Sequence, residues 1–186
     1  MDPIQTAFQN VPREAFLPEE IRPQAMRDEA LPIGYGQTNS QPYTVEKMLR
    51  WLDPKPGDKI LDIGSGSGWT SALLASITGD SGHVFAVEKI PELVVFGKEN
   101  CTQLGITNVT FFEASDTLGL PQHAPYDRIL VSAAASALPD GLVSQLDLGG
   151  KLVVPVKNII VEIAKTDAGD LDAIQHPGFV FVPLIP

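Results

Sequence analysis

A turn with alternating glycines gives the clearest chemical signal in this sequence. Residues 64–68 read Gly-Ser-Gly-Ser-Gly and directly follow the apolar run 59–63, in which Asp62 is the one acid. Glycine adopts positive φ angles and lets the backbone approach a ligand closely, and such turns between a strand and a helix bind phosphate-like or nucleotide-like groups. We therefore expect a nucleotide-like ligand here. The turn residues expected to contact it are Gly64, Ser65, Gly66, Ser67 and Gly68.

Glu88 ends the second predicted strand and is a candidate for ribose recognition. It lies about 20 residues beyond the glycine turn, where an acid in nucleotide-binding α/β folds accepts hydrogen bonds from the ribose. We expect Glu88 to accept hydrogen bonds from both ribose hydroxyls. Lys89 stands beside it, and we expect both side chains to contact the cofactor. The dinucleotide spacing GxGxxG needs a small residue where this chain has Trp69, so a dinucleotide oxidoreductase is the weakest alternative.

The elements that must position these residues form an alternating pattern. Between residues 59 and 156, short β-branched runs alternate with helical segments, which predicts an α/β fold with a mostly parallel, Rossmann-like doubly wound sheet. Pro and Gly in the segment 114–126 argue against a continuous helix there. The expected strands are 59–63, 83–87, 109–112, 128–131 and 152–154, and the expected helices are 70–77, 91–104 and a segment near 142–146.

The two ends of the chain differ from this core. Residues 158–165, a polar turn at 167–170 and residues 179–183 predict an antiparallel hairpin at one edge of the sheet, where Pro183 removes no ladder hydrogen bond. We expect one domain over residues 1–186, with an N-terminal cap (1–58), a cofactor-binding core (59–156) and C-terminal edge strands (157–186).

Composition limits the partners. The formal net charge of -10 disfavours binding to nucleic acid or to anionic membranes, and the apolar runs are shorter than the roughly 20 residues needed to span a bilayer. Cys101 is the single cysteine and is expected to pack as a small buried residue. The three histidines are scattered, so no metal site is expected. We expect a cytoplasmic monomer.

A longer motif names a family. Residues 31–42, LPIGYGQTNSQP, closely resemble the signature LPIGxGQTISxP of protein-L-isoaspartate O-methyltransferases. The glycine turn preceded by Asp62 is similar to the first motif of class I S-adenosylmethionine-dependent methyltransferases. The likeness continues in residues 11–16, 124–129, 132–135, 145–156 and 181–184.

The resemblance implies a repair enzyme that transfers a methyl group from S-adenosyl-L-methionine to the free carboxylate of L-isoaspartyl residues in damaged proteins. It implies that Ser40 belongs to the active site, that Gln37 and its neighbours up to Ser40 lie near the sulfonium, and that Asp62 lies near the methionine or ribose part. A carboxylate with a pKa of about 3.9 is already ionised at neutral pH and needs no strong base. A hydroxyl of Ser40 or Thr38 would orient it for attack.

Three departures from the family pattern leave alternatives open. Asn39 replaces the isoleucine of the signature, and residues 157–158 replace a longer loop. Ala114-Ser115-Asp116 replaces Gly-Asp-Gly, so either Ser115 or Asp116 contacts adenine. The alternative functions are a divergent methyltransferase of another carboxylate or of a small molecule, and a non-catalytic domain that binds the cofactor or a partner protein.

Overall fold

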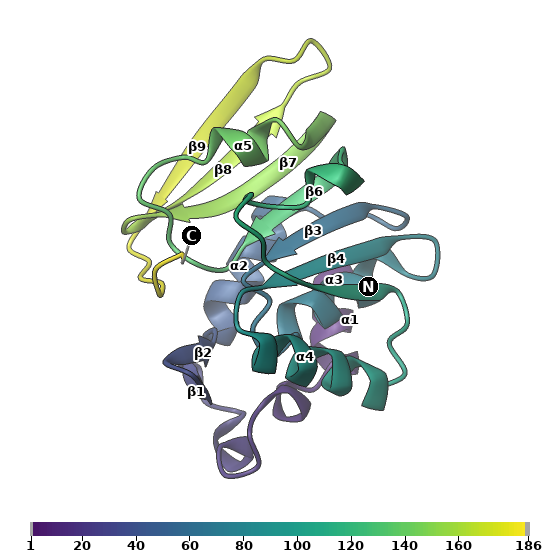
Figure 1. Cartoon of the computed structure of the whole chain (residues 1–186), viewed down its shortest axis with the longest axis vertical. Helices are drawn as coiled ribbons and strands as arrows, with labels where there is room; N and C mark the ends of the chain where they lie inside the picture. The colour runs from purple at the N-terminus through teal and green to yellow at the C-terminus, as the bar shows by residue number, and fades with distance from the viewer. Residues whose placement is uncertain (1, 185–186) are drawn as a thin grey trace.

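The computed structural model describes residues 2–184 and is built around a seven-stranded sheet (Figure 1). Its strands are β3 (Lys59–Ile63), β4 (His83–Glu88), β5 (Val109–Glu113), β6 (Tyr126–Val131), β7 (Leu146–Val156), β8 (Ile159–Lys165) and β9 (Leu171–Pro177). Their order across the sheet is β5-β4-β3-β6-β7-β8-β9. The pairs from β5 to β7 are parallel, whereas β8 and β9 add antiparallel pairs. This arrangement confirms the predicted α/β fold with an antiparallel C-terminal edge.

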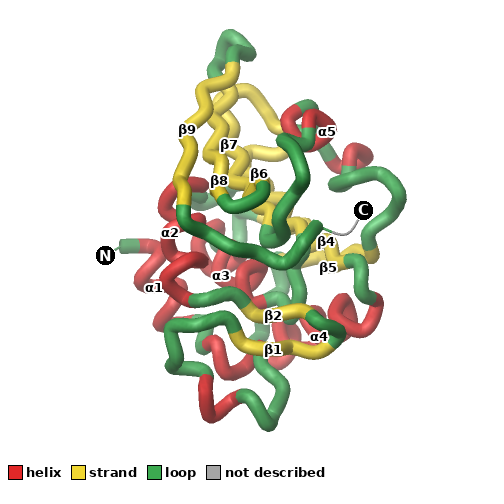
Figure 2. The backbone as a smooth tube through the Cα atoms, turned by 90° about the vertical axis from the view of Figure 1, so that its left-hand side faces the viewer, coloured by secondary structure: helices red, strands yellow, loops and turns green. Residues whose placement is uncertain are grey.

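The two faces of the sheet are covered differently (Figure 2). One face carries the four longer helices, α1 (Pro3–Asn10), α2 (Pro42–Leu52), α3 (Trp69–Thr78) and α4 (Pro91–Gln103). The other carries the segment 114–125, which contains the short 3-10 helix η3 (Pro121–His123), and the four-residue helix α5 (Asp140–Val143). The prediction that 114–126 is not a continuous helix is confirmed. No helix within residues 2–184 combines the length and the apolar character needed to cross a membrane.

Helix α2 shows how sequence periodicity places an element on this sheet. Pro42 occupies its first turn, where the missing N–H costs no helical hydrogen bond. Its buried residues Val45, Met48, Leu49 and Leu52 recur at three- and four-residue spacing and face the sheet. On helix α4, Cys101 is 2% exposed and burial raises the pKa of its thiol to about 12, which confirms it as a small buried residue.

Residues 31–39 form a separate two-stranded hairpin outside the main sheet. Strands β1 (Leu31–Gly34) and β2 (Gln37–Asn39) pair antiparallel, and Gly34 at the end of β1 and the connecting residues Tyr35 and Gly36 all have positive φ. The hairpin follows the 3-10 helices η1 (Arg13–Phe16) and η2 (Arg22–Gln24) and leads into α2. Ile33 packs near the glycine turn, because a Cβ on Gly66 would lie 3.1 Å from Ile33 Cδ1. The hairpin therefore brings residues 37–40 to the turn.

Two predicted elements were wrong. The expected edge strand 179–183 is instead β9, because Gly178 with φ +96° turns the chain away after Pro177. Residues 182–184 then run beside Ala134, which bonds through its backbone to Val182 and Leu184. The helix expected near 142–146 ends at Val143, because Leu146 pairs with Tyr126 and begins β7.

Candidate functional site

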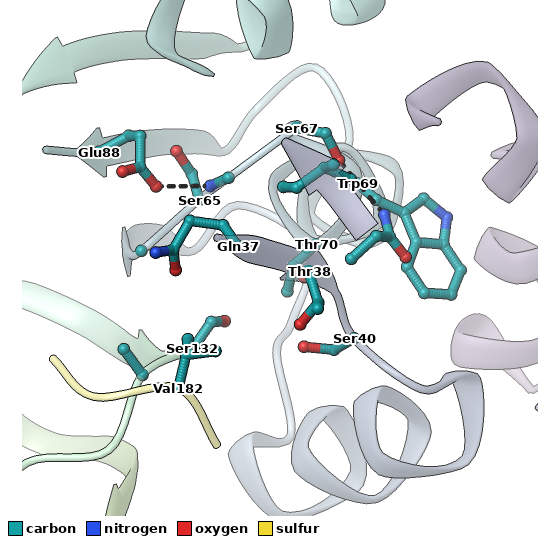
Figure 3. Close-up of a pocket in the computed structure, with 15 residues that line it drawn as sticks. Gln37, Thr38, Ser40, Ser65, Ser67, Trp69, Thr70, Glu88, Ser132 and Val182 are labelled. Atoms are coloured by element: carbon teal, nitrogen blue, oxygen red, sulfur yellow. Dashed lines mark hydrogen bonds between the residues drawn. The ribbon is translucent and has the colours of Figure 1, made fainter. Parts of the chain in front are cut away.

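Three adjoining hollows lie at the carboxyl ends of the parallel strands. The narrow hollow, of about 50 Å³, lies between β2 and the glycine turn (Figure 3). It shares Thr38, Ser40, Ser132 and Val182 with an outer hollow of about 320 Å³. It shares Gln37, Gly64 and Ala133 with a large hollow of about 660 Å³. The narrow hollow therefore adjoins both of the others, and we refer to it as the passage. The volume of the large hollow suits a small-molecule ligand.

The glycine turn is fixed by backbone geometry that side chains would disturb. Gly64, Gly66 and Gly68 all have positive φ, and the N–H groups of Gly64 and Ser65 donate to the carbonyl of Val87 at 2.9 and 3.1 Å. A Cβ on Gly68 would lie 3.0 Å from Gly97 Cα, so α4 packs directly on the turn. Gly68 thus supports the turn from outside the hollows, and the other four turn residues line the narrow hollow.

Ser65 provides a test of whether a polar ligand fits. Its hydroxyl is buried and has no hydrogen-bond partner within residues 2–184, although the residue lines the narrow hollow. A buried hydroxyl without a partner is unfavourable unless a ligand or water satisfies it. The turn therefore presents both an open backbone and an unused hydroxyl to a polar ligand.

Glu88 also lines the narrow hollow and is oriented by three backbone N–H groups. Its Oε1 accepts from Lys89 N at 2.8 Å and from Ile90 N at 3.0 Å, and its Oε2 accepts from Gly66 N at 2.9 Å (Figure 3). A carboxylate has about four acceptor positions. In this conformation the remaining Oε2 position suits one further hydroxyl, whereas the sequence suggested that Glu88 accepts two.

Hydroxyl groups dominate the passage. Thr38 and Ser40 lie on one side of the narrow hollow, and Ser132 and Val182 come from other segments on the other side (Figure 3). Positions two apart in an extended segment share a face, which explains why Thr38 and Ser40 point the same way. Among the described residues, no Lys or Arg lines the narrow or the outer hollow. The passage can therefore orient an anionic group through hydrogen bonds.

The structure does not bring Asp62 into any of these hollows. Its side chain is fully buried between β3 and α3, and Oδ2 accepts a hydrogen bond of 2.6 Å from Ser71 Oγ. Burial and, to a smaller extent, the negative charge of Glu88 raise the pKa of Asp62 to about 7, although the hydrogen bond from Ser71 opposes this shift. In this structure Asp62 lies behind the turn instead of at the ligand surface.

Lys89, Ser115 and Asp116 line the large hollow. The hydroxyl of Ser115 is used locally, since it accepts from Thr117 N and donates to Thr117 O, both at 3.3 Å. Asp116 has no comparable local hydrogen bond among the described residues, so its carboxylate is the more available acceptor. Lys157 and Asn158 form the tight connection between β7 and β8 and also line this hollow.

Sequence reasoning assigned no site role to several lining residues. These are Ser132 to Ala135 after β6 and residues 181–184 near the C-terminus. A signal for the first group existed, because residues that follow neighbouring parallel strands meet at one edge of the sheet. For the second group the sequence predicted a strand, and only its backbone pairing with Ala134 brings it to the site.

Comparisons with known proteins agree along the whole chain. The family model described as Protein-L-isoaspartate(D-aspartate) O-methyltransferase (PCMT) matches residues 1–186. The chain is 47% identical over 187 residues to the protein-L-isoaspartate O-methyltransferase of Aeropyrum pernix, covering 98% of this chain and 72% of the relative. It is 43% identical over 183 residues to that of Methanothrix thermoacetophila, covering 98% and 87%.

Two solved structures are similar over all of this chain. A protein-L-isoaspartate O-methyltransferase matches with a TM-score of 0.91 and 28% identity, and this chain spans 62% of its length. A putative protein-L-isoaspartate O-methyltransferase from Plasmodium falciparum, in complex with S-adenosyl-L-homocysteine, matches with a TM-score of 0.86 and 26% identity, and this chain covers 91% of it.

Proposed function

The chain belongs to the protein-L-isoaspartate(D-aspartate) O-methyltransferase family, and from that premise we propose that it methylates the free carboxylate of L-isoaspartyl residues in damaged proteins, with S-adenosyl-L-methionine as the methyl donor. The observation that carries the proposal is the passage lined by Thr38 and Ser40. It adjoins both the large hollow, whose volume suits the cofactor, and the outer hollow, where we place the acceptor.

The residues present fit this cofactor. The positive-φ glycines keep the turn free of side chains, Ser65 offers a buried hydroxyl without a partner, and Glu88 retains an acceptor position for a ribose hydroxyl. When bound, S-adenosyl-L-methionine supplies an electrophilic methyl group on a positively charged sulfur. The similar structure from Plasmodium falciparum, a complex with S-adenosyl-L-homocysteine, supports the same assignment.

We assign the adenine contact to Asp116. Both Ser115 and Asp116 line the large hollow, but the Ser115 hydroxyl already makes two hydrogen bonds to Thr117. A carboxylate accepts a hydrogen bond from an amino group without having to rotate a hydroxyl away from an existing partner. Lys89, on the same wall, is the cationic side chain that we place near the cofactor.

Thr38 and Ser40 are proposed to orient the acceptor. The free α-carboxylate of an isoaspartyl residue is ionised at neutral pH, so its oxygen is already nucleophilic and needs no general base. The hydroxyls of Thr38 and Ser40 donate hydrogen bonds to one oxygen of the acceptor and hold the other toward the passage, which lowers the entropy cost of alignment. Gln37, which lines both the narrow and the large hollow, closes the passage on the cofactor side.

The outer hollow is proposed to receive the peptide that carries the damaged residue. Gln41 and Thr44 at the start of α2 form its polar wall, and residues 180–182 form its apolar wall. A hollow with both polar and apolar walls suits a peptide, because it can contact the peptide backbone and the flanking side chains. We further propose that the protein acts as a cytoplasmic monomer that binds neither nucleic acid nor membranes, consistent with its net charge of -10.

One experiment tests the function. The purified protein is incubated with methyl-labelled S-adenosyl-L-methionine and either of two synthetic peptides that differ only in an aspartyl or an isoaspartyl linkage. We expect base-labile label on the isoaspartyl peptide alone. Cofactor binding by calorimetry without label on either peptide would contradict the proposal and favour a non-catalytic domain or a different acceptor.

A further inference from the structure

Asn39 is a buried amide that joins two parts of the site. It ends β2 directly before Ser40, and only 5% of its surface is exposed. Its Oδ1 accepts a hydrogen bond of 2.7 Å from Arg13 Nε, and its Nδ2 donates to Ser67 Oγ at 3.3 Å. The amide therefore connects η1, through β2, to the glycine turn. An isoleucine, the residue in the signature, would make neither bond.

The chemistry of Arg13 fixes the orientation of this amide. A guanidinium has only donors, so the amide atom that faces it must be the oxygen, and the NH2 group must then face Ser67. Burial lowers the pKa of Arg13 to about 10, which leaves it protonated at neutral pH. Arg13, which can only donate, therefore determines that Asn39 accepts from Arg13 and donates to Ser67.

Arg13 also binds the backbone of residues 39–40, next to the proposed acceptor site. Its Nη2 donates to the carbonyl oxygens of Asn39 at 3.1 Å and of Ser40 at 2.9 Å, and its guanidinium lies 5.3 Å from the ring centroid of Trp69. Further bonds reach the carbonyl oxygens of Arg27 at 2.9 Å and Glu29 at 2.8 Å. With so many bonds on one rigid planar group, Arg13 is a fixed frame for residues 39–40.

Ser67 is linked to the proposed cofactor ligands on its other side. Its carbonyl accepts a hydrogen bond of 3.0 Å from Asn100 Nδ2 on α4, and the adjacent Gly66 donates to Glu88 Oε2 at 2.9 Å. A ligand that takes the remaining position on Glu88 therefore acts on the same short turn to which Asn39 is bonded. Three residues, Gly66, Ser67 and Asn39, connect Glu88 to Ser40.

We propose that Asn39 is a positioning residue that couples occupancy of the cofactor site to binding of the acceptor at Ser40. The inference rests on the function proposed above, because it takes S-adenosyl-L-methionine as the ligand of the turn. A cofactor bound to the turn restrains Ser67 further, and through its hydrogen bond to Asn39, together with Arg13, it restrains the backbone of Ser40. Reciprocity requires that the acceptor strengthens cofactor binding by the same factor.

The test measures binding rather than turnover. The affinity of an isoaspartyl peptide is measured by calorimetry with and without saturating S-adenosyl-L-homocysteine. For the wild type we expect the peptide to bind about fivefold more tightly when S-adenosyl-L-homocysteine is present, the factor that corresponds to about 1 kcal/mol. In Asn39→Leu, which removes both hydrogen bonds at similar size, we expect this factor to fall to about one.

Two further variants separate coupling from folding. Ser67→Ala keeps the bond between Arg13 and Asn39 and is expected to lose the coupling as well. Asn39→Asp is expected to restore it, because one oxygen accepts from Arg13 and the other accepts from the Ser67 hydroxyl, which rotates to donate. Asn108→Leu is the matched control, since Asn108 bonds to the carbonyls of Ala75 and Gly79 and lines none of the three hollows.

The outcomes distinguish this inference from the proposed function. If S-adenosyl-L-homocysteine does not bind the wild type, the proposed function fails and the coupling with it. If it binds but leaves peptide affinity unchanged, or if Asn39→Leu and Ser67→Ala retain the wild-type factor while remaining folded by thermal unfolding, the coupling role of Asn39 is overturned and the proposed function stands.

Discussion

The hydroxyl of Ser71 donates a hydrogen bond of 2.6 Å to Oδ2 of Asp62, between α3 and β3. Both side chains are fully buried, and Oδ1 of Asp62 has no hydrogen-bond partner in the described part of the chain, residues 2–184. Burial removes the carboxylate from water and raises the pKa of Asp62 to about 7, because the single hydrogen bond from Ser71, which lowers the pKa, offsets only part of the lost hydration.

This raised pKa predicts a loss of stability as the pH rises. The unfolded chain releases the Asp62 proton near pH 4, whereas the folded chain keeps it up to about pH 7. Between these values the folded state binds more protons, so the free energy of unfolding falls by up to about 1.4 kcal/mol per pH unit. We expect urea unfolding to show this slope between pH 5 and 7 in the wild type relative to Asp62→Asn.

Asp80→Asn is the control for that experiment, because Asp80 is an exposed carboxylate at the opposite end of α3. It is expected to leave the pH dependence of the wild type in place. If Asp62→Asn keeps the same slope as the wild type, Asp62 is ionised in the folded protein throughout this range.

Replacing Glu88 tests the ribose contact. Glu88→Ala removes a carboxylate that orients Gly66 and that we expect to accept a hydrogen bond from the cofactor. The loss of a hydrogen bond to a charged group weakens binding by about 1.5–3 kcal/mol. Calorimetry with S-adenosyl-L-homocysteine measures it, and Glu113→Ala, at the register position next to Glu88 on β5, is the matched control. Unchanged affinity in Glu88→Ala would remove this residue from the cofactor site.

Ser40→Ala is expected to reduce turnover much more than cofactor affinity. The hydroxyl faces the passage but does not belong to the large hollow, so its loss affects acceptor alignment. We expect kcat to fall by at least about tenfold, or about 1.4 kcal/mol, while the Kd for S-adenosyl-L-homocysteine stays within about twofold. Thr38→Ser, which keeps its hydroxyl, serves as control. Equal losses in kcat and in cofactor affinity would assign Ser40 a structural role.

The packing of α4 on the glycine turn predicts a cost for a single methyl group. Gly68→Ala places a Cβ 3.0 Å from Gly97 Cα at a φ of +88°, so it combines backbone strain with overpacking. We expect the free energy of unfolding to fall by about 2–4 kcal/mol. Gly105→Ala has a similar φ of +69° but meets nothing within 4 Å, so it should show the backbone part alone. Equal effects in urea unfolding would mean that α4 shifts to accommodate the methyl group.

A pair of substitutions decides the adenine contact. Asp116→Asn removes the charged acceptor that we place beside the adenine amino group, and Ser115→Ala removes a hydroxyl whose two hydrogen bonds within residues 2–184 both go to Thr117. We expect the Kd for S-adenosyl-L-homocysteine to rise about tenfold in Asp116→Asn and less than about threefold in Ser115→Ala. The reverse order in calorimetry would assign the contact to Ser115.

Much of the fold is encoded locally. The strand at Lys59–Ile63 and the helix that follows the turn agree with the sequence pattern, because the short apolar run favours a buried strand and the glycines allow the positive φ angles of the turn. Predictions failed where a distant partner decides the structure. Leu146 begins a strand because it pairs with Tyr126, and residues 182–184 run beside Ala134.

The sequence by itself determined the glycine turn, the acid that ends the second strand and the signature that contains Ser40. These features depend on residue types and short spacings, which are the same whatever fold the chain adopts. Only the tertiary structure decided that Asp62 is buried behind the turn, that Ser132 faces Ser40 across the passage and that Asn39 connects Arg13 to Ser67. Such relationships depend on the packing of segments far apart in sequence, so the spacing of residues along the chain does not predict them.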